Sequence, residues 1–312
     1  MKFLYAITYG ICYVFSLLPL KIHYFFSDVV LYPLLYHVVK YRRKVVRKNL
    51  TECFPQKDLK EIAEIEKKFY HWFTDYLLET LKLLSISRES LMKRMTFEGL
   101  DEAMERMTNE NKTFVFVYLG HYCNWEWIAS LNYWTPESFH AAQIYHPLYN
   151  KLFDRMFLQV RSRPGGENIP MKTVLKRIIE LKNEKRPTFI GFISDQAPKW
   201  NSMHHWTEFL NHKTFFFIGG EQIGKKMDAL FYYMDITRPQ RGYYHCRLRL
   251  MTNDAKNIPN YDLTDMYARL LEESIQSHPE YWLWSHKRWK RTYEQWLQRQ
   301  EEITEKQETK HT

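Results

Sequence analysis

The stretch TFVFVYLGHYCNWEW (113–127) decides the fold that the sequence predicts. Its first seven residues are almost all aromatic, aliphatic or β-branched, which is typical of a strand buried on both faces. The run ends at Gly120, and His121 follows directly. Open α/β sheets place their functional groups at the carboxyl ends of strands. We therefore expect His121 to belong to a catalytic or binding site.

Further apolar runs of strand length follow along the chain, and most are separated by segments of helical period. They lie at 140–145, 188–194, 229–236 and 243–251. Before the first strand, residues 57–84 repeat apolar side chains at a spacing of three and four, as an amphipathic helix does. Strands that alternate with helices predict an α/β fold with a central, mostly parallel sheet and helices on both faces.

The amino-terminal residues predict a membrane-anchoring helix. Between Lys2 and Lys21 lie 18 uncharged residues, which at helical rise span about 27 Å of a hydrocarbon core of about 30 Å. Residues 22–39 mix apolar and polar groups and suit an interface, and a basic cluster at 40–48 suits anionic headgroups on the cytoplasmic side. The alternative is a buried helical hairpin with a solvated basic face.

We accordingly predict three regions, an anchor with its basic cluster (1–48), an α/β domain that carries the activity (49–292) and a charged tail (293–312) that is a frayed helix or disordered. The net charge of +9 favours an anionic partner, and nucleic acid, anionic lipid and an acidic carrier protein all meet that condition. The four cysteines form no CxxC pair and are expected to be reduced thiols. Dinucleotide, P-loop, serine-hydrolase and zincin motifs are absent.

His121 and Glu126 are the candidate catalytic pair. On a regular helix their spacing would separate them by about 140°, so they can meet only if His121 lies in the turn and Glu126 in the first helical turn. A carboxylate bonded to one imidazole nitrogen fixes the tautomer and leaves the other nitrogen free to accept a proton from a hydroxyl. The alternative is that His121 caps a helix and Glu126 is a solvated acid in its first turn.

Five segments in a fixed order carry a resemblance to a known family. They are GHYCNWEW (120–127), QIYHPLYNKLFDRMFLQVRSR (143–163), ISDQAPK (193–199), HHWTEFLN (204–211) and HPEYWLWSHKRWK (278–290). The ordered set resembles the lauroyl and myristoyl acyltransferases of lipid A biosynthesis, within the lysophospholipid acyltransferase superfamily and its HxxxxD/E motif. The resemblance is closest to Bacteroides-like members.

This resemblance implies an acyl-carrier-protein thioester as donor, a hydroxyl of a lipid A precursor as acceptor, and a place on the cytoplasmic face of the inner membrane. It implies that His121 and Glu126 form the catalytic dyad and that Arg161 is needed for activity, binding phosphate or the developing oxyanion. It also assigns Asp195 and Gln196 to a DQ pair that shapes the pocket. Asn124 is expected in the substrate site, and no metal or organic cofactor is needed.

Two positions depart from the family pattern. His146 stands where many members have arginine, and Cys123 stands where relatives often have a small residue such as glycine. Cys123 allows a rival mechanism through an acyl-cysteine, against the alternative that it is a small buried packing residue. Two other functions stay open, acyl transfer to a glycerophospholipid or an amino-acid lipid, and a non-catalytic basic protein that binds membranes or nucleic acid.

Overall fold

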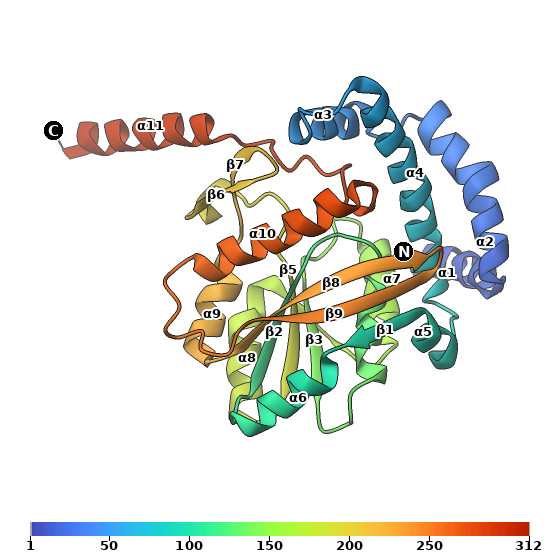
Figure 1. Ribbon diagram of the computed structural model, residues 1–312, viewed down its shortest axis with the longest axis horizontal. Coiled ribbons are helices and arrows are strands. Elements are labelled where there is room, and N and C mark those ends of the chain that lie inside the picture. Colours follow the sequence, from blue (N-terminus) through green and yellow to red (C-terminus); the bar gives the residue numbers. More distant parts are fainter. Residues whose placement is uncertain (1, 312) are drawn as a thin grey trace.

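A seven-stranded sheet in the order β1-β9-β8-β2-β5-β3-β4 forms the centre of the computed structural model, which describes residues 2–311 and the side chains of residues 5–303 (Figure 1). Neighbouring strands are parallel except for the β8–β9 hairpin. The mostly parallel sheet predicted from the sequence is therefore confirmed. Its strands are β1 (Met95–Glu98), β2 (Phe114–Leu119), β3 (His140–Tyr145), β4 (Glu167–Pro170), β5 (Thr188–Ile193), β8 (Leu230–Gln240) and β9 (Tyr243–Thr252).

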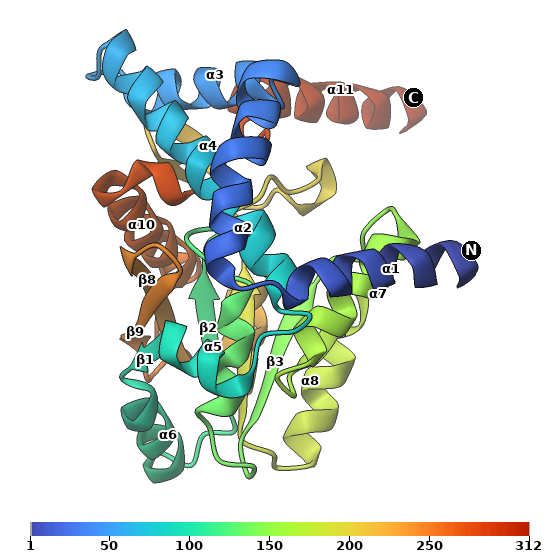
Figure 2. The same ribbon diagram turned by 90° about the vertical axis from the view of Figure 1, so that its right-hand side faces the viewer.

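Strand β2 is the centre of the sheet and pairs in parallel with both β5 and β8. All six of its residues are buried, so both faces of the sheet are covered at this strand. Tyr118 stacks on Tyr267 of helix α10 (Asp262–Ser277) and approaches Gly220 of α9 (Gly219–Met227). Figures 1 and 2 show the helices around the sheet, with the carboxyl end of β2 pointing towards α4 and α10.

Helix α4 (Leu59–Lys82) confirms the amphipathic helix predicted over 57–84. Its first turn is fixed by a capping box, in which the Asp58 side chain accepts backbone N–H groups and Glu61 reaches back to the Asp58 N–H. Further elements are α3 (Arg43–Cys53), α5 (Arg88–Arg94), α6 (Leu100–Asn109), α7 (Lys151–Ser162), α8 (Val174–Asn183), and an antiparallel ribbon of β6 (Trp206–Phe209) and β7 (His212–Phe215).

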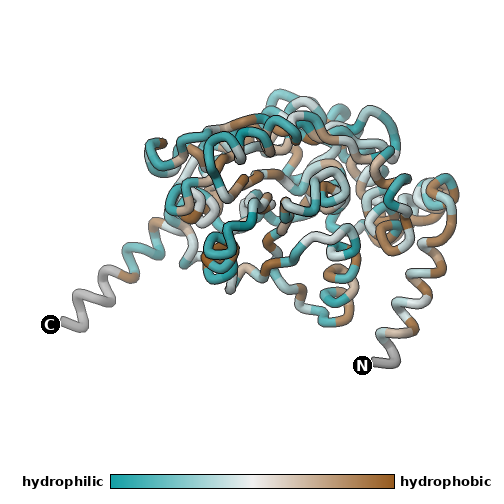
Figure 3. Tube along the Cα trace, turned by 90° about the horizontal axis from the view of Figure 1, so that it is seen from below, coloured by the Kyte–Doolittle hydropathy of each residue, from teal (hydrophilic) through white to brown (hydrophobic). Residues whose placement is uncertain are grey.

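The amino-terminal helix is broken. Helix α1 (Lys2–Leu17) ends before Pro19, and α2 (Leu20–Phe26) continues into π-helical turns at Ser27–Leu31 and Pro33–Val38. Within residues 2–311 no single helix is long and apolar enough to cross a membrane; the two pieces meet the length and composition criteria together but are bent by 110°. Figure 3 shows α1 projecting from the body, with apolar residues along its length. The membrane anchor stays a prediction.

The predicted basic cluster is partly internal. Arg43 and Arg47 both bind the carboxylate of Glu66, which is completely buried in α4. Burial alone would raise the pKa of Glu66, but the hydrogen bonds from Arg47 and Arg43 lower it. Two of the cations expected to face headgroups therefore stabilise the contact between α3 and α4.

The charged tail forms a helix, α11 (Tyr293–His311), which extends away from the body (Figure 1). Its first turns are held by aromatic packing, because Tyr293 and Trp296 both contact Trp206 of the β6–β7 ribbon. Met1 and Thr312, the outer ends of the predicted anchor and tail, lie outside the described residues.

The packing of helix α9 against the sheet can be tested by substituting its glycines. A Cβ on Gly224 would lie 2.2 Å from Phe231 Cζ and 2.9 Å from Phe116 Cδ2, both in rigid rings. We expect Gly224→Ala to lower the free energy of unfolding by roughly 1–3 kcal/mol through overpacking. Gly219→Ala in the same helix meets nothing within 4 Å and serves as the control. The measurement is thermal unfolding, and equal melting temperatures for the two variants would contradict this packing.

Candidate active site

His121 lies at the carboxyl end of β2, where the chain leaves the sheet. The preceding Gly120 allows the close approach of neighbouring elements, since a Cβ there would lie 2.5 Å from Leu271 Cδ1 and 3.4 Å from Asp195 Oδ2. In the parallel register Leu119 pairs with Ile193 of β5. Two residues further along each chain, His121 therefore stands beside Asp195.

Asp195 binds His121 through both carboxylate oxygens. The His121 backbone N–H donates to Oδ2 over 2.8 Å, and ring nitrogen Nδ1 donates to Oδ1 over 2.6 Å. Trp282 Nε1 donates to Oδ2 over 2.8 Å. Burial alone would raise the pKa of Asp195, but the charge and hydrogen bonds of His121 and the Trp282 bond lower it to about 2. An ionised Asp195 keeps the proton on Nδ1 and leaves Nε2 as the acceptor.

The free imidazole nitrogen faces Gln196. The Gln196 side-chain amide lies 3.2 Å from His121 Nε2 and donates to it. The His121 side chain is 18% exposed whereas that of Asp195 is 1% exposed, so solvent reaches the imidazole but not the carboxylate behind it. A hydroxyl that replaced the Gln196 amide would be in position to give its proton to Nε2.

The expected contact between His121 and Glu126 is replaced by a different pair. Glu126 binds Arg161 of α7, with Arg161 Nε to Oε2 at 2.7 Å and Nη2 to Oε1 at 2.5 Å. Glu126 lies at the start of a 3-10 turn, Trp127–Tyr133, after an irregular loop in which Cys123 has a φ of 50°. That loop turns Glu126 towards α7, so the prediction that Glu126 holds the imidazole is corrected: Asp195 does so.

Arg161 is itself mostly buried. Burial would lower its pKa, but the adjacent Glu126 carboxylate outweighs burial and raises it. Glu126 occupies two of the three guanidinium nitrogens, and among the described residues Nη1 has no hydrogen-bond partner. The predicted grip of Arg161 on phosphate or an oxyanion would therefore rest on Nη1.

The side chain of Asn124 is bound by neighbouring groups of the protein. It is completely buried, its amide donates to Glu79 Oε2 over 2.7 Å, and its side-chain oxygen accepts the Trp127 N–H over 3.1 Å. The same Glu79 carboxyl accepts hydrogen bonds from Tyr24 and Tyr244. Burial raises the pKa of Glu79 against the influence of Arg238. Asn124 thus shapes the loop after His121, and the position predicted for substrate binding is not open to a substrate.

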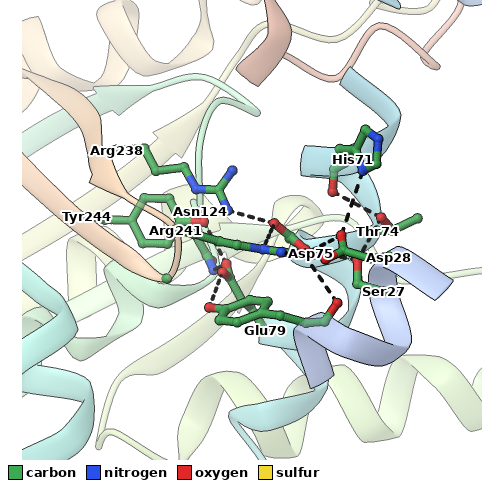
Figure 4. A network of polar contacts seen from close by, with 12 residues as sticks. Ser27, Asp28, His71, Thr74, Asp75, Glu79, Asn124, Arg238, Arg241 and Tyr244 are labelled. Atoms are coloured by element: carbon green, nitrogen blue, oxygen red, sulfur yellow. Dashed lines mark hydrogen bonds and ion pairs between the residues drawn. The ribbon is translucent and has the colours of Figure 1, made fainter. Parts of the chain in front are cut away.

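Figure 4 shows that this network continues into the amino-terminal segment. Arg241 bridges Asp75 of α4 and Asp28 of the first π-helical turn, and Ser27 donates to Asp75 over 2.9 Å. Arg238 binds Asp75 over 2.7 Å. The hairpin β8–β9, helix α4 and the amino-terminal segment are therefore joined by ion pairs around the buried Asp75.

The two positions that depart from the family pattern have ordinary contacts. Cys123 is completely buried, burial raises the pKa of its thiol, and its sulfur lies 3.5 Å from the Ile236 carbonyl oxygen. A thiol held protonated and turned into the core favours the packing role over an acyl-cysteine. His146 is exposed and its Nδ1 lies 2.9 Å from the Pro147 carbonyl.

The loop that carries Asp195 and Gln196 is fixed from the carboxyl-terminal segment. The Ala197 N–H donates to His286 Nε2 over 3.2 Å, and Arg291 Nη1 donates to the Pro198 carbonyl over 2.8 Å. Burial lowers the pKa of His286 to about 4, so the ring is neutral and can accept. Sequence reasoning missed the roles of Trp282 and His286, although both lie in the quoted segment 278–290.

Comparison with protein-family models matches residues 2–291 to the bacterial lipid A biosynthesis acyltransferases. The chain belongs to this family. It is therefore an acyltransferase, and the match includes every side chain of the site described above. A search of curated protein sequences found no match to the chain. Helix α11, which begins at Tyr293, lies wholly outside the segment shared with the lipid A acyltransferases.

The neutral His286 predicts a pH dependence of stability for this lipid A acyltransferase. With a native pKa near 4 and an unfolded value near 6.5, the unfolded chain binds more protons between these values. Stability should therefore fall as the pH drops from 6.5 to 4. His286→Gln keeps an acceptor without a titrating ring, so its melting temperature should decline less over this range. Parallel declines in thermal scans at several pH values would contradict a neutral, proton-accepting His286.

Proposed function

We propose that this enzyme transfers a fatty acyl chain from an acyl-carrier-protein thioester to a hydroxyl of a lipid A precursor, with His121 as general base. The observation that carries the proposal is the 2.6 Å bond between His121 Nδ1 and the buried Asp195 carboxylate, in a chain of the lipid A acyltransferase family. A base with a carboxylate behind it and one free nitrogen in front suits proton removal from a hydroxyl.

The acceptor hydroxyl replaces the Gln196 amide at His121 Nε2 and gives its proton to that nitrogen as its oxygen attacks the thioester carbonyl. Asp195 stabilises the imidazolium that forms, because it is ionised and bonded to Nδ1–H. When the tetrahedral intermediate collapses, the carbon–sulfur bond breaks and the imidazolium returns its proton to the leaving thiolate. One residue thus acts as base and then as acid.

The developing oxyanion needs a hydrogen-bond donor near the reacting carbon. The Gln196 amide, once displaced from Nε2, and the Nη1 of Arg161, which no described residue binds, are the donors that we assign to it. Glu126 acts through Arg161, since a carboxylate bonded to Nε and Nη2 holds the guanidinium plane in one orientation. In this scheme Glu126 is a positioning residue for Arg161.

We also propose that the enzyme works on the cytoplasmic face of the inner membrane. Support comes from the apolar side chains that α1 and α2 expose, among them Ile11, Val14 and Phe25, each about two-thirds exposed. A surface of this kind is typical of contact with an acyl-chain environment. Both proposed substrates carry fatty acyl chains, so an enzyme placed there meets its acceptor at the interface.

Substitutions separate the roles of the two carboxylates. His121→Ala and Asp195→Asn should both lower kcat, by about 10³-fold or more, because the first removes the base and the second leaves the wrong tautomer. Glu126→Gln should lower kcat less than Asp195→Asn, since it removes only the negative charge beside Arg161 and leaves the His121–Asp195 pair intact. The measurement is acyl transfer from acyl carrier protein to a lipid A precursor, with circular dichroism as a check on folding. Asp195→Asn at wild-type rate would overturn the mechanism.

The acceptor is tested in the cell. A strain that lacks this enzyme should make lipid A short by one acyl chain, and mass spectrometry of the extracted lipid measures that difference. Restoring the wild-type gene should recover the full mass, whereas the His121→Ala gene should not. Complete lipid A together with a loss confined to phospholipid or amino-acid lipid would replace the acceptor and leave the chemistry of His121 standing.

A further inference from the structure

A cleft of about 440 Å³ lies between the loop after Asp195 and helix α11. Its lining includes Trp200 from the loop, Lys290 and Arg291 from the segment before the helix, and Arg299 and the acidic Glu302 from the helix. The family match ends at residue 291. One wall of the cleft is therefore built from a helix outside the shared segment.

Five cations gather at and beside this cleft without carboxylate partners. Among the described residues no ion pair involves Arg42, Lys287, Lys290, Arg291 or Arg299, whereas the mostly buried Arg161 and Arg238 are both paired. Burial and the positive charges of Arg291, Arg42 and Lys287 lower the pKa of Lys290. Cations close enough to disfavour one another's charge create a positive potential that an anion would relieve.

The arginines of the cleft are held in place by an aromatic side chain. Arg291 and Arg299 lie 5.6 and 5.8 Å from the centre of the Trp200 ring. Arg291 also donates to the Pro198 carbonyl over 2.8 Å. Guanidinium groups that are fixed before binding lose less entropy when they bind, and their planar forks match the oxygens of phosphate.

The cleft is connected to the reacting atoms by a short loop. Gln196 contacts His121 Nε2, and Trp200 follows four residues later. Four residues of extended chain span at most about 14 Å. A group bound beside Trp200 can therefore belong to the same substrate molecule that reaches His121.

We propose that this cleft binds a phosphate group carried by one of the two substrates. The inference rests on the proposed function, in which both substrates are phosphorylated: the acceptor on its sugar headgroup and the donor on the phosphopantetheine arm of the carrier. The chemistry shared by both is a phosphate oxygen bound by Lys290, Arg291 and Arg299. The cleft would then position the substrate while His121 performs the proton transfer.

The test uses the full-length enzyme with Lys290→Gln and Arg299→Gln combined, since both side chains are exposed and neither touches the His121 site. Lys93→Gln with Lys226→Gln, on α5 and α9, removes the same charge from exposed positions elsewhere. Initial rates are measured against the concentration of donor, of phosphorylated acceptor and of acceptor treated with phosphatase. Calorimetry with inorganic pyrophosphate measures binding without turnover.

The expected result is a KM for phosphorylated acceptor raised about tenfold or more at unchanged kcat, with no change for the phosphatase-treated acceptor or in the control variant. A raised KM for the donor alone would assign the cleft to the carrier's phosphate. Unchanged KM values for both, or an equal effect in the control, would overturn the proposal while acyl transfer stands.

If the wild type transfers no acyl group, the proposed function fails. Loss of pyrophosphate binding in the variant alone would then still support the phosphate site, and equal binding would overturn it.

Discussion

The register between β2 and β5 is the constraint on which the site depends. Because Leu119 pairs with Ile193, the residues that leave the two strands place an imidazole against a carboxylate. A shift of one residue would turn every side chain of the buried strand β2 to the opposite face, which its fully apolar composition alone does not forbid. Register is specified instead by the packing on both sides, such as Tyr118 on Tyr267 and Gly224 on Phe231.

Three buried carboxylates in this part of the fold each bind hydrogen-bond donors. Asp195 accepts hydrogen bonds from His121 and Trp282. Glu126 is paired with Arg161, and Glu66 is paired with Arg43 and Arg47. A buried carboxylate without such partners would be several kcal/mol less stable. Glu79 is the different case, since burial raises its pKa and it is surrounded by hydroxyl and amide groups. The loop that begins at His121 contacts both kinds of carboxyl group. Asp195, whose pKa is lowered, binds His121, and Glu79, whose pKa is raised, binds Asn124.

The sequence predicts what depends on local pattern. The five apolar runs are all strands, and β3 has the predicted bounds His140–Tyr145. The strands β1 (Met95–Glu98) and β4 (Glu167–Pro170) escaped prediction because four residues give too little alternation to see. His121 could be selected because it follows a buried strand. Its partner could not be found by spacing, since Asp195 is 74 positions away and only the parallel register joins them. Spacing along the chain favours the nearest carboxylate in sequence, Glu126, which binds Arg161 instead.

The hydrogen bond from Trp282 to Asp195 has a consequence for the timing of biosynthesis. A chain emerging from the ribosome completes β2 and β5 well before residue 282, at roughly 5–20 residues per second. Before Trp282 is synthesised and folded into place, the Asp195 carboxylate lacks one of its hydrogen-bond donors. The loop after Gln196 likewise lacks its hydrogen bonds with His286 and Arg291. The site is therefore assembled only after residues 282–291 have been synthesised. Incomplete products released early would carry the histidine and the aspartate without the frame that holds them.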